Sequence, residues 1–204
     1  MNELELSALM VSRVCHDLVG PLGAVVNGLE VLEDERDAKM REDALRLVAT
    51  SAGQALARIQ FMRIAFGAAG SAGAELDLGE IGRLVGGVIE GGRVRLEWSV
   101  PHAYWPKDRA KLLMNVALLG AESLPRGGLV KVLVEAGSKT FHVHAAGQVA
   151  RLAQETLGAL KGEALSAPLD ARFIHPYLTY CLARGVGTDL AVTAGDGFVE
   201  FTAG

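Results

Sequence analysis

The sequence predicts an α+β fold in two parts, a long N-terminal helical hairpin followed by a sandwich of helices and a sheet. Two N-terminal stretches carry apolar residues at alternating steps of three and four, the period of an amphipathic helix. From Leu76 onward this pattern gives way to short alternating runs mixed with helical segments, which is typical of α+β layers. The small residues from Gly67 to Ala74 separate the parts, so we predict domains at 1–72 and 73–204.

The first stretch, residues 4–33, is expected to form one long helix. One row of apolar residues recurs every seven positions and a second row interleaves with it: Leu4, Val11, Leu18, Val25 and Leu32, then Ala8, Cys15, Leu22 and Leu29. Together the rows form the seam of a helix that packs in coiled-coil fashion. Pro21 removes one backbone donor, so we expect a kink about one turn before it.

A second long helix is expected from about Lys39 to Phe66, after a polar turn at residues 33–37. Its seam again alternates steps of three and four: Leu45, Val48, Ala52, Ala55, Ile59, Met62 and Phe66. Two helices joined by a short turn form an αα-hairpin. One hairpin cannot enclose both seams, so we expect two copies to pair as a four-helix bundle, which makes the chain a homodimer.

The rest of the chain reads as alternating helices and strands. We expect helices at 78–90, 107–123, 149–161 and 171–183, and strands at 93–100, 129–135, 140–144, 189–193 and 197–201. The order is α-β-α-β-β-α-α-β-β. Turn residues between the last two pairs of strands indicate hairpins, and the helices are expected to cover one side of the sheet.

Composition excludes several classes of protein. The 204 residues carry a formal net charge of −4 and no block of five like charges, so no nucleic-acid partner is expected. The N-terminus has acids where a signal peptide has bases, and no apolar run approaches the roughly 20 residues that span a bilayer. Cys15 and Cys181 lie too far apart to indicate a zinc site. We therefore expect a cytoplasmic protein with no membrane partner.

His16 is the candidate for chemistry in the first helix. It directly follows the seam residue Cys15, so its side chain should leave the seam and face solvent. Gly20 and Gly23 would leave open space along the same face for another protein. A neutral imidazole is a competent nucleophile, and phosphorylation of a ring nitrogen gives a reactive phosphoramidate. From its position alone, however, His16 reads more economically as an ordinary exposed histidine.

Charged neighbours surround His16 on the helix. Arg13, one turn earlier, could offset negative charge on a phosphoryl group. Asp17 points about 100° away from His16 because the two are adjacent in a helix. Its flexible side chain could still bond a ring nitrogen and fix the tautomer.

The run Val14–Leu22, Val-Cys-His-Asp-Leu-Val-Gly-Pro-Leu, resembles the H-box of sensor histidine kinases, His-(Glu/Asp)-Leu-x-x-Pro-Leu. It lies early in the first of two long helices, as in the dimerisation and phosphotransfer domain of that family. The resemblance implies that His16 is phosphorylated and that Asp17 orients it or exchanges a proton. Around His16, it implies a surface that binds receiver domains: Ser12, Arg13, Val19, Gly20 and Gly23.

The C-terminal part is similar to the ATP-binding domain of the same kinases, without its nucleotide motifs. Residues 111–128 resemble the N-box region, where Asn115 fits the first asparagine and Leu119 replaces the second, which ligates magnesium. An apolar side chain cannot supply the oxygen that Mg²⁺ requires. In the Asp-x-Gly-x-Gly motif, Ala145 replaces the aspartate and Val149 the second glycine. Bulky residues at 173–176 occupy the start of the helix that should cradle phosphate.

An H-box hairpin joined to a kinase-ATPase-like domain without ATP motifs resembles the ChpT-type histidine phosphotransferases of alphaproteobacterial phosphorelays. The resemblance implies a homodimer that accepts phosphoryl groups from the receiver domain of a hybrid kinase and donates them to response regulators. It implies no cofactor or metal of its own, with Mg²⁺ held in the partner receiver. Two alternatives stay open: a divergent histidine kinase, and a non-catalytic dimeric scaffold that binds receivers.

Overall fold

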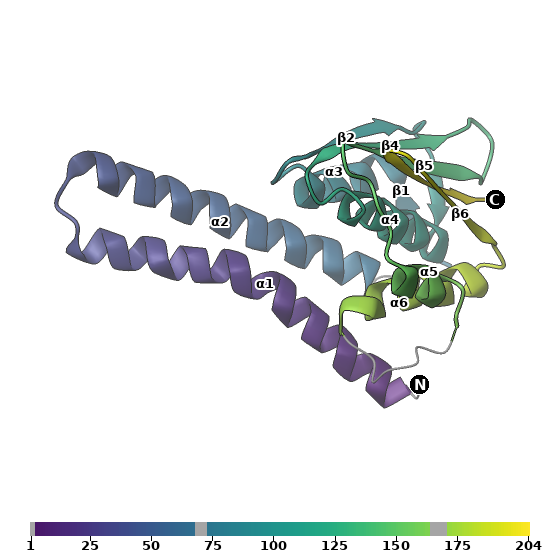
Figure 1. Ribbon diagram of the computed structural model, residues 1–204, viewed down its shortest axis with the longest axis horizontal. Helices are drawn as coiled ribbons and strands as arrows, with labels where there is room; N and C mark the ends of the chain where they lie inside the picture. Colours follow the sequence, from purple (N-terminus) through teal and green to yellow (C-terminus); the bar gives the residue numbers. More distant parts are fainter. Residues whose placement is uncertain (1–2, 68–72, 164–170) are drawn as a thin grey trace.

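The computed structural model of the chain describes residues 3–67, 73–163 and 171–204. Figure 1 shows a long helical hairpin that projects from an α+β body. The hairpin consists of α1 (Glu3–Asp34) and α2 (Ala38–Ala65). Both helices were predicted within a residue or two of these bounds. The predicted domain boundary at residue 72 falls in the segment 68–72, outside the described residues.

Local hydrogen bonds form the turn between the two helices. Asp37 caps α2, its carboxylate accepting from the backbone N–H groups of Lys39 and Met40 at 3.0 and 2.9 Å. Arg41 donates back across the turn to the carbonyl oxygens of Leu32 and Glu35. Asp37 thus satisfies donors left free at the start of α2, and Arg41 satisfies carbonyl oxygens at and just after the end of α1. α1 continues through Pro21, and its ribbon bends along its length (Figure 1), as a missing backbone donor allows.

The predicted seams are divided between two faces of the hairpin. Gly28 is buried where the helices approach, and a Cβ placed there would lie 2.6 Å from Val48 Cγ2. Leu18 and Val25 are half-buried on the side of α1 that faces α2. The other row of each helix faces outward, and its larger members are exposed: Leu22 and Leu29 on α1, Leu45 and Ile59 on α2. Val11, in the same row as Leu18, is also exposed. The hairpin alone therefore leaves much of its apolar seam exposed.

α1 is also long and apolar enough, from Leu4 to Asp34, to cross a membrane by length and composition. This differs from the expectation that no apolar stretch of the chain approaches the required length. α1 passes this test because one stretch of 18 residues within it has high hydropathy and contains at most two charged side chains. The outward-facing rows of apolar residues account for this hydropathy equally well.

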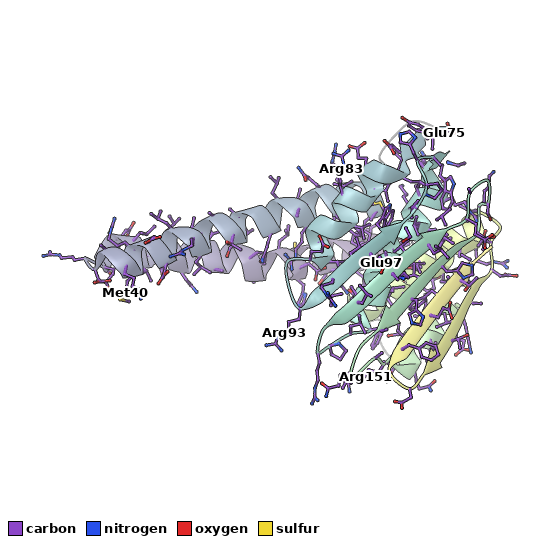
Figure 2. The ribbon with its side chains drawn as sticks, turned by 90° about the horizontal axis from the view of Figure 1, so that it is seen from above. Met40, Glu75, Arg83, Arg93, Glu97 and Arg151 are labelled. Atoms are coloured by element: carbon purple, nitrogen blue, oxygen red, sulfur yellow. The ribbon has the colours of Figure 1, made fainter. Side chains whose placement is uncertain are left out.

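The body is built on a mixed five-stranded sheet of order β2-β4-β5-β7-β6. The strands are β2 (Val94–Ser99), β4 (Gly128–Val134), β5 (Phe141–Ala146), β6 (Leu190–Gly195) and β7 (Phe198–Ala203). β2 and β4 run parallel, and the remaining neighbours are antiparallel. Both predicted hairpins are confirmed. Figure 2 shows the strands side by side, with Glu97 on β2 and Met40 at the distant tip of the hairpin.

Helices cover the apolar face of this sheet. α3 (Leu78–Ile89) and α4 (Lys107–Glu122) pack on the sheet, whereas α5 (Gln154–Leu160) and α6 (Ala171–Gly185) pack against each other, and α6 also packs against α4. Alternate residues of β5, namely Phe141, Val143 and Ala145, are fully buried on this face, as the period of a half-buried strand requires. α5 is shorter than predicted. Residues 149–153 form a loop in which the Arg151 N–H donates to the Ser123 carbonyl oxygen at 3.0 Å.

Two short strands were not predicted. β1 (Glu75–Asp77) and β3 (Tyr104–Pro106) pair antiparallel beside α3 and α4. Three residues carry too little periodicity to be recognised as a strand. Trp105 on β3 is nevertheless buried in the core, with the Arg109 guanidinium 5.5 Å from its ring centroid.

The end of α2 belongs to the core of the body. Phe61, Met62 and Ala65 are buried in the same apolar cluster as α3 and α4. Lys111 donates to the Gly67 carbonyl oxygen at 2.6 Å, and Asn115 donates to that of Ala65 at 3.2 Å. These side chains from α4 satisfy carbonyl groups at the end of α2, so the hairpin is fixed to the body at this end.

Candidate functional site

His16 lies in the first half of α1, and its side chain is 81% exposed. Leu18, two residues later, faces α2. At about 100° per residue this spacing turns His16 away from α2 and toward solvent. The predicted exposure of His16 therefore agrees with its place on the helix.

Asp17 contacts the imidazole directly. His16 Nδ1 lies 3.1 Å from Asp17 Oδ1. A carboxylate only accepts hydrogen bonds, so Nδ1 carries the proton and donates. The Nε2 atom then keeps its lone pair, which is the state a nucleophile needs. The contact that the sequence allowed between Asp17 and a ring nitrogen is therefore present, and the orienting role of Asp17 stays a prediction.

Arg13 is turned away from the exposed ring and toward the body. Its Nε donates to Asp17 Oδ2 at 2.8 Å, and its second terminal nitrogen donates to Glu122 Oε1 at 2.5 Å. The side chain is only 15% exposed. Burial lowers the pKa of Arg13, but Glu122 and Asp17 outweigh burial and raise it. Arg13 thus presents little surface to a partner and instead joins two carboxylates.

Glu122, the last residue of α4, extends this contact into the body. His175 Nδ1 on α6 lies 3.3 Å from Glu122 Oε2. Burial raises the pKa of Glu122, but His175 and Arg13 together lower it to about 2, so the carboxylate is ionised at neutral pH. The His175 side chain is fully buried, with its ring centroid 5.7 Å from that of Phe66.

No pattern in the sequence predicts a role for Glu122 or His175. The prediction treated His175 only as one of the bulky residues that obstruct a phosphate site. Glu122 is 109 residues from Arg13 along the chain, and no periodicity connects positions so far apart. The one available signal was the opposite charge of Arg13 and Glu122, which does not by itself show that the two side chains meet.

The surface beside His16 is open. Val19, one turn after His16, is 68% exposed, and Ser12 is also exposed. A Cβ placed on Gly20 or Gly23 would meet no atom within 4 Å. These four residues lie along the part of α1 that carries His16, so another domain can approach the imidazole here.

The residues compared with the ATP-binding motifs have structural roles. Asn115 is fully buried, and its amide group donates to the carbonyl oxygens of Ala65 and Lys111. Leu119 and Ala145 are buried. An open cavity of about 390 Å³ lies between α4, α6 and the loop before α5, and its lining includes Leu119, Glu122 and Arg151. Among the residues that the structure describes, no three His, Cys, Asp or Glu side chains gather as metal ligands.

An exposed histidine beside a carboxylate on a helical hairpin fits the class of phosphotransfer proteins that the sequence predicts. Residues 78–197 match the model of the histidine phosphotransferase C-terminal domain. Since this match covers more than half of the chain, the chain belongs to the histidine phosphotransferase family.

Two relatives are similar over the whole chain. The protein phosphotransferase ChpT of Brucella abortus (strain 2308) is 38% identical over 206 residues, which cover 100% of this chain and 97% of that protein. A solved structure of a bacterial phosphotransferase is 34% identical with a TM-score of 0.88, over 100% of this chain and 98% of its own. The ChpT-type resemblance is thereby confirmed. The chain is a phosphotransferase of phosphorelays, and response regulators are its partners.

Proposed function

We propose that His16 carries the phosphoryl group, accepting it from a receiver-domain aspartate of a hybrid kinase and passing it to receiver domains of response regulators. The observation that supports this most directly is the exposed imidazole of His16, with Asp17 held 3.1 Å from its Nδ1. The side chain is 81% exposed, so a partner can reach the free Nε2.

The transfer step follows from this geometry. The lone pair of His16 Nε2 attacks the phosphorus of the aspartyl phosphate, so a P–N bond forms. The P–O bond to the receiver aspartate breaks, and its electron pair leaves with the carboxylate. The imidazole ring gains positive charge while Nδ1 keeps its proton, and the Asp17 carboxylate stabilises that charge through the Nδ1–H bond. Transfer to a second receiver reverses each change.

Receiver domains would bind over the open surface of α1. Ser12, Val19, Gly20 and Gly23 leave the approach to His16 free of side chains that would block it. The inward turn of Arg13 limits its direct contact with a receiver to the small part of its side chain that is exposed. Its role is instead argued below from its two carboxylate partners.

The chain would need no cofactor and no metal of its own in this step. Leu119 lines the cavity beside α4 with an apolar side chain, and Asn115 already donates to two carbonyl oxygens. The Mg²⁺ that assists aspartyl-phosphate chemistry would sit in the acidic pocket of the partner receiver. A protein of this kind, acting on response regulators, is expected in the cytoplasm.

A homodimer would cover the apolar stripes that the hairpin leaves exposed. On α1, Leu22 and Leu29 each come one residue after a position that faces α2. On α2, Leu45 and Ile59 each come one residue after a position that faces α1. Because the helices run antiparallel, this equal offset turns both stripes to the same side of the hairpin. A second copy that packs there would complete a four-helix bundle.

We expect Leu22→Glu to separate the dimer. The substitution places a charge in the centre of an apolar stripe, where burial against a second copy would leave it unpaired. Light scattering after gel filtration should show the molar mass fall from twice the chain mass of 21.5 kDa to a single chain. Leu47→Glu is the matched control, because Leu47 is similarly exposed but lies off the stripe. A Leu22→Glu variant that keeps the mass of the wild type would contradict this interface.

The function is tested with a receiver domain phosphorylated beforehand by its own hybrid kinase and radiolabelled ATP. We expect the label to pass from this receiver to the chain within minutes, while labelled ATP alone leaves the chain unlabelled. Label taken from ATP alone would instead indicate a divergent histidine kinase. A chain that binds the receiver and takes no label from either source would be a scaffold.

A further inference from the structure

One polar bridge connects the body of the molecule to the helix that carries His16. Five side chains follow one another with alternating donors and acceptors: His16, Asp17, Arg13, Glu122 and His175. The first three lie on α1, whereas Glu122 ends α4 and His175 lies on α6. A residue of the body therefore reaches the reacting imidazole through only two intervening side chains.

We propose that Glu122 is a positioning residue for phosphotransfer: it holds Arg13, which holds Asp17, which fixes the tautomer of His16. This inference rests on the proposed role of His16. It assigns a catalytic contribution to the body, through the carboxylate at the end of α4.

The orientation of Asp17 needs such support. Adjacent helical residues point about 100° apart, so Asp17 must turn its carboxylate back along the helix to reach His16. Without a second contact, the short side chain would exchange among rotamers in water. Arg13 supplies that contact at 2.8 Å on Oδ2 and leaves Oδ1 for the imidazole. The two oxygens of Asp17 thus have separate partners.

Arg13 would not hold this position by itself. A lone Arg–Asp pair on one helix face contributes little, because both side chains are hydrated and mobile. Glu122 binds the other end of the guanidinium and draws the side chain under the surface, where only 15% of it remains exposed. It also takes a share of the positive charge of Arg13, so that Asp17 remains a strong acceptor for Nδ1–H.

Glu122 is itself well fixed. Its second oxygen faces Nδ1 of His175, which is buried beside Phe66. His175 Nε2 is buried without a hydrogen-bond partner among the described residues. A ring protonated at Nδ1 donates to the Glu122 carboxylate whether or not Nε2 also carries a proton. The buried ring therefore serves as a fixed donor to Glu122.

The test is the Glu122→Gln variant, which keeps the size of the side chain and removes its charge. We expect the single-turnover rate constant for transfer from a phosphorylated receiver to fall between about ten- and a hundredfold. The affinity for the unphosphorylated receiver should stay within about twofold, since Glu122 acts on orientation and not on docking. Glu42→Gln is the matched control: the same change at a side chain that is 69% exposed near the hairpin tip.

Two further measurements separate this role from a purely structural one. Nitrogen-15 shifts of His16 should show less of the Nδ1–H tautomer in Glu122→Gln and no change in Glu42→Gln. In a double-mutant cycle, Arg13→Gln combined with Glu122→Gln should transfer no more than about twofold slower than Arg13→Gln alone, because both act through one path.

The inference is overturned if Glu122→Gln transfers at the wild-type rate, or if its affinity for the receiver falls by the same factor as its rate constant. It is also overturned if the rate losses of Arg13→Gln and Glu122→Gln multiply in the double variant. Melting temperatures establish that each variant is folded. If Glu122→Gln melts early, Arg13→Gln alone provides the rate and tautomer readouts from the α1 side. A His16→Gln variant, run in parallel, distinguishes failure of this inference from failure of the proposed function, because only the latter would leave that variant labelled.

Discussion

The His16→Gln variant should accept no phosphoryl group from a receiver, with the rate constant falling at least about a thousandfold. A glutamine amide has no lone pair that is nucleophilic enough to attack an aspartyl phosphate. The imidazole is 81% exposed, and its hydrogen bond within the described part of the chain is to Asp17. Its replacement should therefore change the free energy of unfolding by no more than about 0.5 kcal/mol. Transfer of radiolabel from a phosphorylated receiver measures the effect, and circular dichroism confirms the fold.

The control for this experiment is another exposed histidine. His102 lies in the body, where its ring packs edge-on against Tyr104 at 5.7 Å, and His102→Gln should be labelled like the wild type. The chain has five histidines, so a labelled His16→Gln protein would place the phosphoryl group on one of the others. That result would end the assignment of His16 even though the chain remains a phosphotransferase.

The part of the site that the sequence predicted is the part that one helix builds. Arg13, His16 and Asp17 are neighbours through helical spacing alone, so the motif and its place in a heptad pattern suffice to bring them together. Glu122 and His175 join them only because α4 and α6 pack against α1 and α2. That packing depends on the burial of Phe61 and Met62 in the body, which no local pattern expresses.

The same distinction explains the fold. The heptad rows predicted both long helices. An apolar row does not, however, indicate whether the other helix of the hairpin, the body or a second copy will pack against it. The structure shows that Leu18 and Val25 face α2, while Leu22 and Leu29 remain exposed. Asn115 illustrates the converse case. Asn115 matches an asparagine of a nucleotide-binding motif, yet its amide group donates to the carbonyl oxygens of Ala65 and Lys111. The residue type alone therefore did not reveal its hydrogen-bond partners.

The polar bridge also explains why a body without ATP-binding motifs can matter to transfer. The end of α2 is held by Lys111 and Asn115, and α1 is held by Glu122 through Arg13. Both helices of the hairpin are therefore attached to α4. A body fixed in this way can orient Asp17 without ever approaching His16 itself.

The second large effect is expected at Asp17, where asparagine should be more harmful than alanine. An asparagine amide can donate to Nδ1 of His16 and so stabilise the tautomer with the proton on Nε2, which has no free lone pair for attack. We expect Asp17→Asn to slow transfer by about a hundred- to a ten-thousandfold, the range seen when a histidine is held in the wrong tautomer. Single-turnover transfer from a phosphorylated receiver gives the rate constant.

Two further variants show whether the tautomer or the charge of Asp17 is responsible. Asp17→Ala removes the negative charge but leaves the ring free to populate both tautomers, so it should transfer faster than Asp17→Asn. Asp17→Glu keeps a carboxylate within reach of Nδ1 and should remain within about tenfold of the wild type. If alanine and asparagine slow transfer equally, the loss follows the charge that both remove, and Asp17 acts by stabilising the cationic ring during transfer. A faster alanine variant separates the two effects, because both variants lack the charge and only the asparagine amide can donate a hydrogen bond to Nδ1.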